Sequence, residues 1–196
     1  MIKSKIANVF RHQYDSINSF TDRIHIVDYT DKTKNLPIKR SVEIYSPNEP
    51  SDIFSFRIDN PNNISIDSII FDNLSFVLKN GKSRSQCEAV VFPTVSCQDS
   101  WILFCELKYS VKPRKNSKNI RKAIKQLYRT QYYFRSENII NFSNICYLVV
   151  SLPLQGEPFP NFTIPQSLLI NLKNKKNIIL RLKNSLEITN QKLLYI

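Results

Sequence analysis

Residues 101–110 constrain the fold of this 196-residue chain more than any other stretch. They begin with five apolar residues, Trp-Ile-Leu-Phe-Cys, and such a run is typical of a central strand covered on both faces. Glu106 and Lys108 then interrupt the apolar pattern. Side chains two apart on a strand point the same way, so both charges share a face with Ile102 and Phe104. One face of this strand therefore changes from apolar to charged.

A second segment, residues 86–93, has the same character. Glu88 shares one face of the predicted strand with Val90 and Phe92, and the other face carries Cys87, Ala89 and Val91. The link between the two segments is polar and contains Pro, Ser, Gln and Asp, which predicts a hairpin.

The register of this hairpin decides between two kinds of site. A hairpin centred on Cys97 sets Glu88 opposite Glu106. Opposed Cβ atoms lie about 4.5–5.5 Å apart, and two carboxylates there repel each other unless a cation lies between them. A slip of two residues would set Glu88 opposite Lys108 instead. The first register indicates a divalent metal held by oxygen ligands, and the second indicates an ion pair.

These charged residues resemble the motif of the PD-(D/E)XK nucleases, the restriction-endonuclease-like superfamily. The matching positions are Glu88 on one strand and Glu106-Leu-Lys108 on the next, and the resemblance covers about residues 71–153. It implies that Glu88 and Glu106 hold one or two Mg²⁺ (or Mn²⁺) ions and that Lys108 helps to activate the attacking water. Glu88 stands where the family more often has Asp, and no Pro precedes it.

The same three residues could instead have only structural roles, with no part in catalysis. Glu88 would then be a solvated acid at a sheet edge, and Glu106 and Lys108 would neutralise each other at the end of the sheet. A Glu-x-Lys triplet alone does not distinguish these cases. The combination of an upstream acid, apolar strands and a following helix favours the catalytic interpretation.

Positive charge follows the Glu-x-Lys strand on one side of a predicted helix. The helix covers residues 117–136, and at about 100° per residue its basic residues gather opposite its apolar face. No acid occurs between Ser110 and Ser136 to balance them. This one-sided charge favours contact with phosphates over solvation alone. The residues expected to bind nucleic acid are Lys112, Arg114, Lys115, Lys118, Lys122, Lys125 and Arg129.

Gln126 lies between the basic and the apolar faces of this helix. Exonuclease-like members of the resembled family carry a Gln in this helix near the active site. The resemblance therefore makes Gln126 a further candidate for a catalytic role.

Composition narrows the class of partner. The net charge of +12 suits a polyanion, so the expected partner is nucleic acid, with DNA favoured over RNA. No stretch approaches the ~20 apolar residues of a membrane span, and the first residues lack a signal-peptide core, so we expect a cytoplasmic protein without a membrane partner. Two glycines are too few for a phosphate loop or a dinucleotide fingerprint. Four cysteines without Cys-x-x-Cys spacing argue against a zinc site.

The remaining patterns predict an α/β fold with one nuclease-like domain over residues 1–196. Its core, residues 64–153, comprises a strand at 75–79 that an Asn80-Gly81 turn joins to the Glu88 strand, the Glu-x-Lys strand, the crossover helix and a parallel strand at 145–152. We expect a mixed β-sheet flanked by helices, that is, a restriction-endonuclease-like core. Added to this core are an N-terminal extension over 1–63 and a C-terminal extension over 154–196.

The extensions have their own expected elements. The first is a helix at 4–20 followed by short β runs between residues 23 and 58, where His25 is expected on the surface. The C-terminal extension is expected to hold a short helix at 168–172 and strands at 178–182 and 192–196. Its pattern fits docking onto the core or formation of a homodimer.

The sequence thus predicts a Mg²⁺-dependent nuclease. Two alternatives stay open: a nucleic-acid-binding protein on the same fold without catalysis, and a basic interaction or immunity protein that binds an acidic protein partner.

Overall fold

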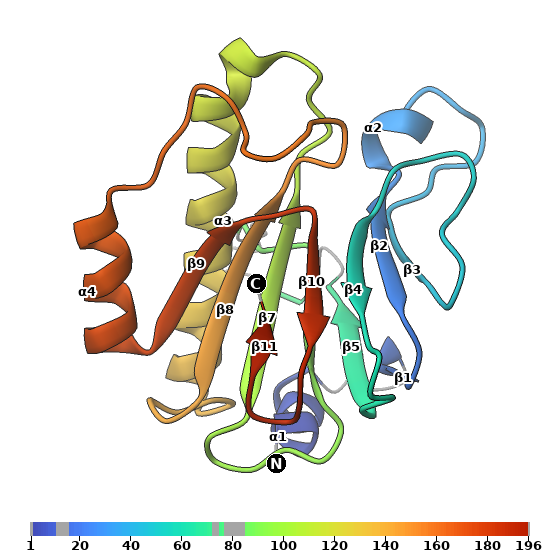
Figure 1. The fold of residues 1–196 in the computed structure, drawn as a ribbon. Coiled ribbons are helices and arrows are strands. Elements are labelled where there is room, and N and C mark those ends of the chain that lie inside the picture. The colour runs from blue at the N-terminus through green and yellow to red at the C-terminus, as the bar shows by residue number, and fades with distance from the viewer. Residues whose placement is uncertain (1, 11–15, 72–74, 77–84, 196) are drawn as a thin grey trace.

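The computed structural model describes residues 2–10, 16–71, 75–76 and 85–195. Within these residues the protein is a mixed α/β structure whose strands form a six-stranded and a five-stranded mixed sheet (Figure 1). Helices cover one face of the six-stranded sheet, and the five-stranded sheet covers the other. None of the helices in the described ranges is long and apolar enough to cross a membrane.

The six-stranded sheet contains the two strands that carry the predicted site. Its order is β1 (Asn18–Phe20), β5 (Ile66–Ile70), β6 (Ala89–Pro93), β7 (Trp101–Leu107), β8 (Ile145–Ser151) and β9 (Ile178–Leu182). In this sheet the neighbours β1, β5, β6 and β7 pair antiparallel, whereas β7, β8 and β9 pair parallel. The β6–β7 ladder joins Ala89 to Cys105 and Val91 to Leu103. These pairs are equidistant from Cys97, so the predicted register is confirmed for the paired residues, whereas Glu88 lies before the ladder and is not paired with Glu106 as predicted.

Helix α3 (Asn116–Ser136) makes the crossover between β7 and β8, after a short 3₁₀ turn at Pro113–Lys115. Its apolar residues, among them Ile120, Leu127 and Phe134, pack on the face of the sheet that carries Phe104 and Val90. Helix α1 (Ile2–Val9) and helix α4 (Gln166–Lys176) contribute to the same core. The predicted helix at 117–136 and the parallel strand after it are therefore confirmed.

The predicted N-terminal helix at 4–20 is too long. Helix α1 ends at Val9, residues 11–15 lie outside the described ranges, and the last three residues of the prediction form β1 at the sheet edge. There Ser19 Oγ donates a hydrogen bond of 2.5 Å to the buried Asp67, and Phe20 pairs with Ile66. Tertiary pairing overrides the helical pattern of these residues.

The predicted first core strand was misplaced. Residues 66–70, not 75–79, form β5, which pairs with β6 from Ile66 opposite Pro93 to Ile70 opposite Ala89. Ser75 and Phe76 lie outside the strands, and residues 77–79 with the Asn80-Gly81 turn fall outside the described ranges. Phe76 instead packs against the rings of Phe10 and Phe71, with centroids 5.1 and 4.8 Å apart. The apolar run at 64–78 held two candidate strands, and pairing with β6 selects the earlier one.

The five-stranded sheet joins the two ends of the chain. Its order is β11 (Leu194–Tyr195), β10 (Ser185–Ile188), β4 (Phe56–Asp59), β2 (Ile24–Asp28) and β3 (Val42–Tyr45), with helix α2 (Thr30–Thr33) after β2. β10 pairs parallel with β4, although more than a hundred residues separate them. The two extensions that the sequence predicts separately therefore form one sheet, and β10 was not predicted.

His25 on β2 corrects a prediction, because it is buried rather than on the surface. β2 is a central strand whose neighbours are β3 and β4. The His25 Nδ1 atom lies 2.9 Å from Ser55 Oγ, and burial lowers the pKa of the imidazole. Both faces of β2 are covered, which the alternation with isoleucines did not reveal.

Candidate active site

The structure brings three of the four predicted catalytic residues, Glu88, Glu106 and Lys108, together at the carboxyl end of β7. Lys108 Nζ contacts Glu106 Oε1 directly and lies 3.8 Å from Glu88 Oε1. The Lys108 N–H donates to Ser151 O at the end of β8, with a distance of 2.9 Å, so the residue continues the parallel ladder beyond β7. Backbone pairing on both sides therefore fixes where this lysine and the two carboxylates meet.

An irregularity in the pairing of β6 with β7 positions the Glu88 side chain near Lys108. Its N–H donates to Cys105 O at 3.1 Å, although Ala89 is already the ladder partner of Cys105. Two residues opposite one is the arrangement of a β-bulge, a feature that re-aims side chains. The Glu88 Oε2 atom then accepts the Leu107 N–H at 2.7 Å. A side chain thus replaces a main-chain acceptor at the end of the ladder.

The bulge also corrects the predicted position of Cys87. The sequence places Cys87 on the same face as Ala89, whereas in the structure it belongs to the core under helix α3, together with Val90. An extra residue in one strand reverses the alternation of side chains from that residue onward. Strict period-two alternation therefore fails just before β6.

Helix α3 holds the segment before the bulge through two polar side chains. Gln126 Nε2 donates to Gln86 O at 2.9 Å, and Thr130 Oγ accepts the Cys87 N–H at 2.8 Å. Thr130 Oγ in turn donates to Gln126 O. The structure thus places Gln126 beside the chain that leads into Glu88. Thr130 was not predicted, and its signal is a polar residue on the apolar face of the helix.

Glu106 is the most deeply buried charge at the site. Its side chain is fully buried, and its Oε2 atom has no hydrogen-bond partner within the described ranges. Burial raises the pKa of Glu106 to about 7, although Lys108 acts in the opposite direction. Burial and the charge of Glu106 together raise the pKa of Glu88. The two carboxylates therefore favour a bound cation or proton.

Burial lowers the pKa of Lys108, but the charges of Glu106 and Glu88 outweigh it, and the net shift is upward. Lys108 is therefore protonated at neutral pH. It is a cation between two acids and has no free electron pair with which to take a proton.

A further acid, Asp28, reaches the site from the five-stranded sheet. It ends β2, whose carboxyl end lies at the same end of the molecule as that of β7 (Figure 1). The Asp28 N–H donates to Tyr109 Oη at 3.4 Å. Burial is the largest cause of the raised pKa values of Glu88 and Glu106. The negative charge of Asp28 is a smaller cause and raises both pKa values further. In the sequence Asp28 is part of a short β run, and no role at the site was predicted for it.

The predicted basic residues all lie on the surface, on helix α3 and the turn before it. They are Lys112, Arg114, Lys115, Lys118, Lys122, Lys125 and Arg129, and each is exposed. Among the described residues none of them forms an ion pair with a carboxylate. Burial, Lys108 and Asp28 have larger effects on the pKa of Glu106. The positive charge of Lys122 is a smaller effect, and it lowers this pKa. Within the basic face, Lys122 is therefore the residue whose charge reaches Glu106.

The carboxylates fit a hard cation in donor type. Carboxylate oxygens are the ligands that Mg²⁺ prefers, and it is commonly bound through one or two of them while it keeps several waters. The unpartnered Oε2 atom of Glu106 is a donor that a cation would satisfy. No cluster of three or more His, Cys, Asp or Glu side chains in the described ranges is arranged as a metal site.

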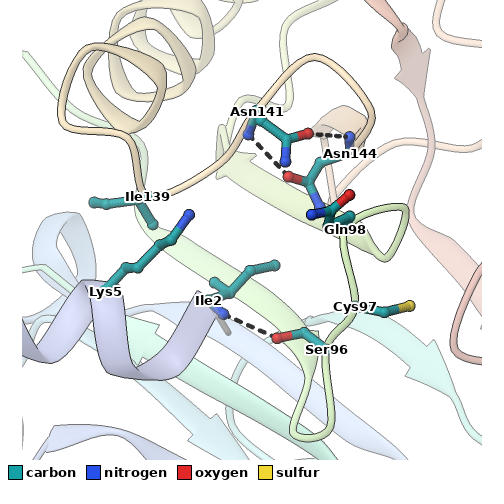
Figure 2. A pocket seen from close by; sticks show the side chains of 8 residues that line it. All are labelled: Ile2, Lys5, Ser96, Cys97, Gln98, Ile139, Asn141 and Asn144. Atoms are coloured by element: carbon teal, nitrogen blue, oxygen red, sulfur yellow. Dashed lines mark hydrogen bonds between the residues drawn. The ribbon is translucent and has the colours of Figure 1, made fainter.

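A separate small pocket lies at the opposite end of β7, next to helix α1 (Figure 2). It encloses about 160 Å³. Two of its polar side chains accept backbone hydrogen bonds: the Ile2 N–H donates to Ser96 Oγ, and the Asn141 N–H donates to Asn144 Oδ1, both at 2.9 Å. None of the predicted site residues lines this pocket, so it plays no part in the candidate site.

Comparison of the chain with protein-family models, curated proteins and solved structures finds no match. The function is therefore inferred from the geometry and charge of the site itself.

Proposed function

We propose that the protein is a metal-dependent nuclease that hydrolyses phosphodiester bonds of nucleic acid, with DNA favoured. The proposal includes a restriction-endonuclease-like core formed by β5 to β8 and helix α3. One observation carries it: Glu88, Glu106 and Lys108 meet at the end of a central strand, beside a helix face with unbalanced positive charge. Perturbed titratable groups of this kind cluster at functional sites.

The residues take distinct roles in this proposal. Glu106 and Glu88 would hold Mg²⁺ or Mn²⁺, which supplies positive charge that polarises a phosphate and lowers the pKa of water. The protonated Lys108 orients the attacking water or a phosphate oxygen and stabilises negative charge that develops there. Glu88 also keeps the end of β7 in place through the Leu107 N–H.

The basic face of helix α3 positions the substrate. Its exposed side chains are free of carboxylate partners within the described ranges, and the charge of one of them, Lys122, acts on Glu106. Neutralising several phosphates in this way gives salt-dependent affinity without sequence preference. Gln126 supports the site by holding the Gln86 carbonyl.

Cleavage assays on purified protein test the proposal. Single-stranded and duplex DNA and RNA are incubated with Mg²⁺ or Mn²⁺ and, in parallel, with chelator. We expect cleavage that needs metal and that is lost in Glu106→Gln and in Lys108→Met, while Glu187→Gln on the exposed side of β10 stays active. Melting temperatures verify that the variants are folded. Full activity in a folded Glu106→Gln protein would refute the assignment.

A second candidate function is nucleic-acid binding without cleavage. It is favoured by the direct contact between Lys108 and Glu106, which already neutralises one carboxylate. A binding protein would retard the same oligonucleotides intact, with or without metal.

A further inference from the structure

Phe54 is a large apolar side chain exposed beside the candidate site. It lies in the loop before β4, and 63% of its surface is exposed. Its carbonyl oxygen accepts a hydrogen bond of 2.6 Å from Tyr109 Oη. Tyr109 follows Lys108 directly in the chain, so this bond ties the Phe54 loop to the end of the Glu-x-Lys strand.

The surroundings of Tyr109 place this contact next to the carboxylates. Its hydroxyl accepts the Asp28 N–H at 3.4 Å, and Asp28 ends β2 at the same end of the molecule as the carboxyl end of β7 (Figure 1). The hydroxyl therefore links the Phe54 loop both to Asp28 and to the residue that follows Lys108. Phe54 thus borders the site on the side of the five-stranded sheet, whereas the basic face of helix α3 belongs to the opposite layer.

A hollow of about 370 Å³ lies beside Phe54 and is lined by residues 49–54. It carries two carboxylates. Asp52 is engaged by Tyr29 Oη at 2.6 Å and by Lys32 Nζ at 2.9 Å, while Glu49 accepts the Ser55 hydroxyl at 2.7 Å. Both carboxylates are thus engaged within the protein, and Lys32 balances the charge of Asp52. The exposed ring of Phe54 is therefore the group beside this hollow that a flat, aromatic base would contact.

We propose that Phe54 is a stacking platform for an unpaired base of the substrate, and that the substrate is therefore single-stranded. This inference rests on the proposed function, because it assumes that a nucleic-acid backbone runs past Glu88 and Lys108. A base in a duplex already stacks on its neighbours, whereas every unpaired base has a free π-face for an aromatic ring. Phosphates on helix α3 and a base on Phe54 would hold the strand from two sides.

Binding of a single-stranded DNA oligonucleotide that contains 2-aminopurine tests the stacking. The measurements are made with chelator and without metal, so that cleavage does not interfere. Phe54→Ala is expected to weaken binding about 5-fold to 100-fold, the range for loss of one stacked base, and to abolish the fluorescence quenching of 2-aminopurine. Phe54→Trp restores both. Phe142→Ala is the matched control, because Phe142 is 71% exposed and precedes β8 at the other end of the sheet.

The outcomes separate this inference from the proposed function. Binding and quenching that are unchanged in Phe54→Ala would overturn the stacking, even if the wild type cleaves. An equal loss of affinity for the matching duplex would overturn the assignment of a single strand, and absence of binding by the wild type would overturn the stacking, while the cleavage assay with metal decides the proposed function separately. Loss confined to single strands, with no cleavage by the wild type, would support the stacking and reject the nuclease. Melting temperature is expected to stay constant, because the Phe54 side chain is largely exposed.

Discussion

Glu106 is a carboxylate in an unfavourable place. Transfer of a charge into the interior is costly unless the charge is paired and hydrogen-bonded, and here only one oxygen meets a cation, Lys108. The other oxygen has no partner within the described ranges. Structural carboxylates of stable folds are normally satisfied on both oxygens. A half-satisfied buried acid is therefore a sign of chemistry or of ligand binding more than of stability.

The raised pKa of Glu106 makes stability fall as pH rises. The unfolded chain releases this proton near its ordinary pKa of 4.5 and the folded chain near 7, so the folded state binds more protons between these values. In metal-free protein the effect amounts to something on the order of 3 kcal/mol. We expect the melting temperature to fall between pH 5 and pH 8, and to fall by about 5–10 °C less in Glu106→Gln. Calorimetry on both proteins measures this, and equal pH profiles would contradict the raised pKa.

At the scale of single residues the sequence predicted the site through periodicity. The alternation of side chains and a hairpin centred on Cys97 were enough to place Glu88 and Glu106 at one end of one sheet. The same reasoning placed Cys87 on the wrong face. The bulge that changes its face depends on a contact between strands, in which Glu88 accepts the Leu107 N–H. The position of Asp28 near the two glutamates was not predicted, because it depends on how the five-stranded sheet packs on the six-stranded sheet. No local pattern encodes either.

Among the elements, helix α3 combines a packing face, a basic face and two polar side chains that support the bulge. Its range and both faces follow from a periodicity of 3.6 and one-sided charge, which are local properties. The strand expected at 75–79 illustrates the opposite case. Residues 66–70 and 75–79 both suit a strand by composition, and only the pairing of Ile66 to Ile70 with β6 decides between them.

The hydroxyl of Thr130 is expected to matter for stability and for the site. Thr130→Val removes the acceptor of the buried Cys87 N–H while it keeps the volume, which costs about 1–3 kcal/mol. For a chain of this size the melting temperature should fall by roughly 2–10 °C. Thr130→Ser keeps the acceptor and should stay close to the wild type apart from the lost methyl group. Equal melting temperatures of the Val variant and the wild type would show that this hydrogen bond contributes nothing.

The basic face of helix α3 is expected to set the salt dependence of binding. Lys118→Gln with Lys125→Gln removes two charges and avoids Lys122, which influences Glu106. On a single strand the slope of log affinity against log salt should flatten by about 1.4. Lys173→Gln with Lys175→Gln on helix α4 is the matched pair, because both lysines are exposed. If the two double variants show the same slope, the basic face of helix α3 does not contact phosphates.

In the molecule as a whole, a second core lies between the two sheets. It combines Ile24 and Phe56 from the N-terminal part, Leu103 from the centre, and Leu186 and Ile188 from the C-terminal part. The parallel pairing of β10 with β4 brings residues near the two ends of the chain together. The sequence predicted short β runs at both ends but not their union, because long-range pairing leaves no periodic signal.

The last segment of the chain is anchored in this second core. Trp101 Nε1 donates to Asn190 O at 2.8 Å, and Tyr147 Oη accepts the Leu194 N–H at 3.2 Å. Both contacts reach strands of the six-stranded sheet, β7 and β8. Residues 185–195 thereby contact the two strands, β7 and β8, that support the candidate site.

Deletion of residues 185–196 is therefore expected to unfold the protein. It removes Leu186, Ile188 and Leu194, whose burial contributes about 1.5–3 kcal/mol each, or about 5–9 kcal/mol together. That is comparable to the whole free energy of unfolding of an ordinary domain, about 5–15 kcal/mol. Urea titration followed by near-UV circular dichroism should show no cooperative transition in the truncated chain, and cleavage should be lost although the site residues remain. Tyr195→Ala is the control, because that side chain is exposed and its loss should leave the transition unchanged. A cooperative transition of the truncated chain near that of the wild type would show that the six-stranded sheet and its helices fold without the second core.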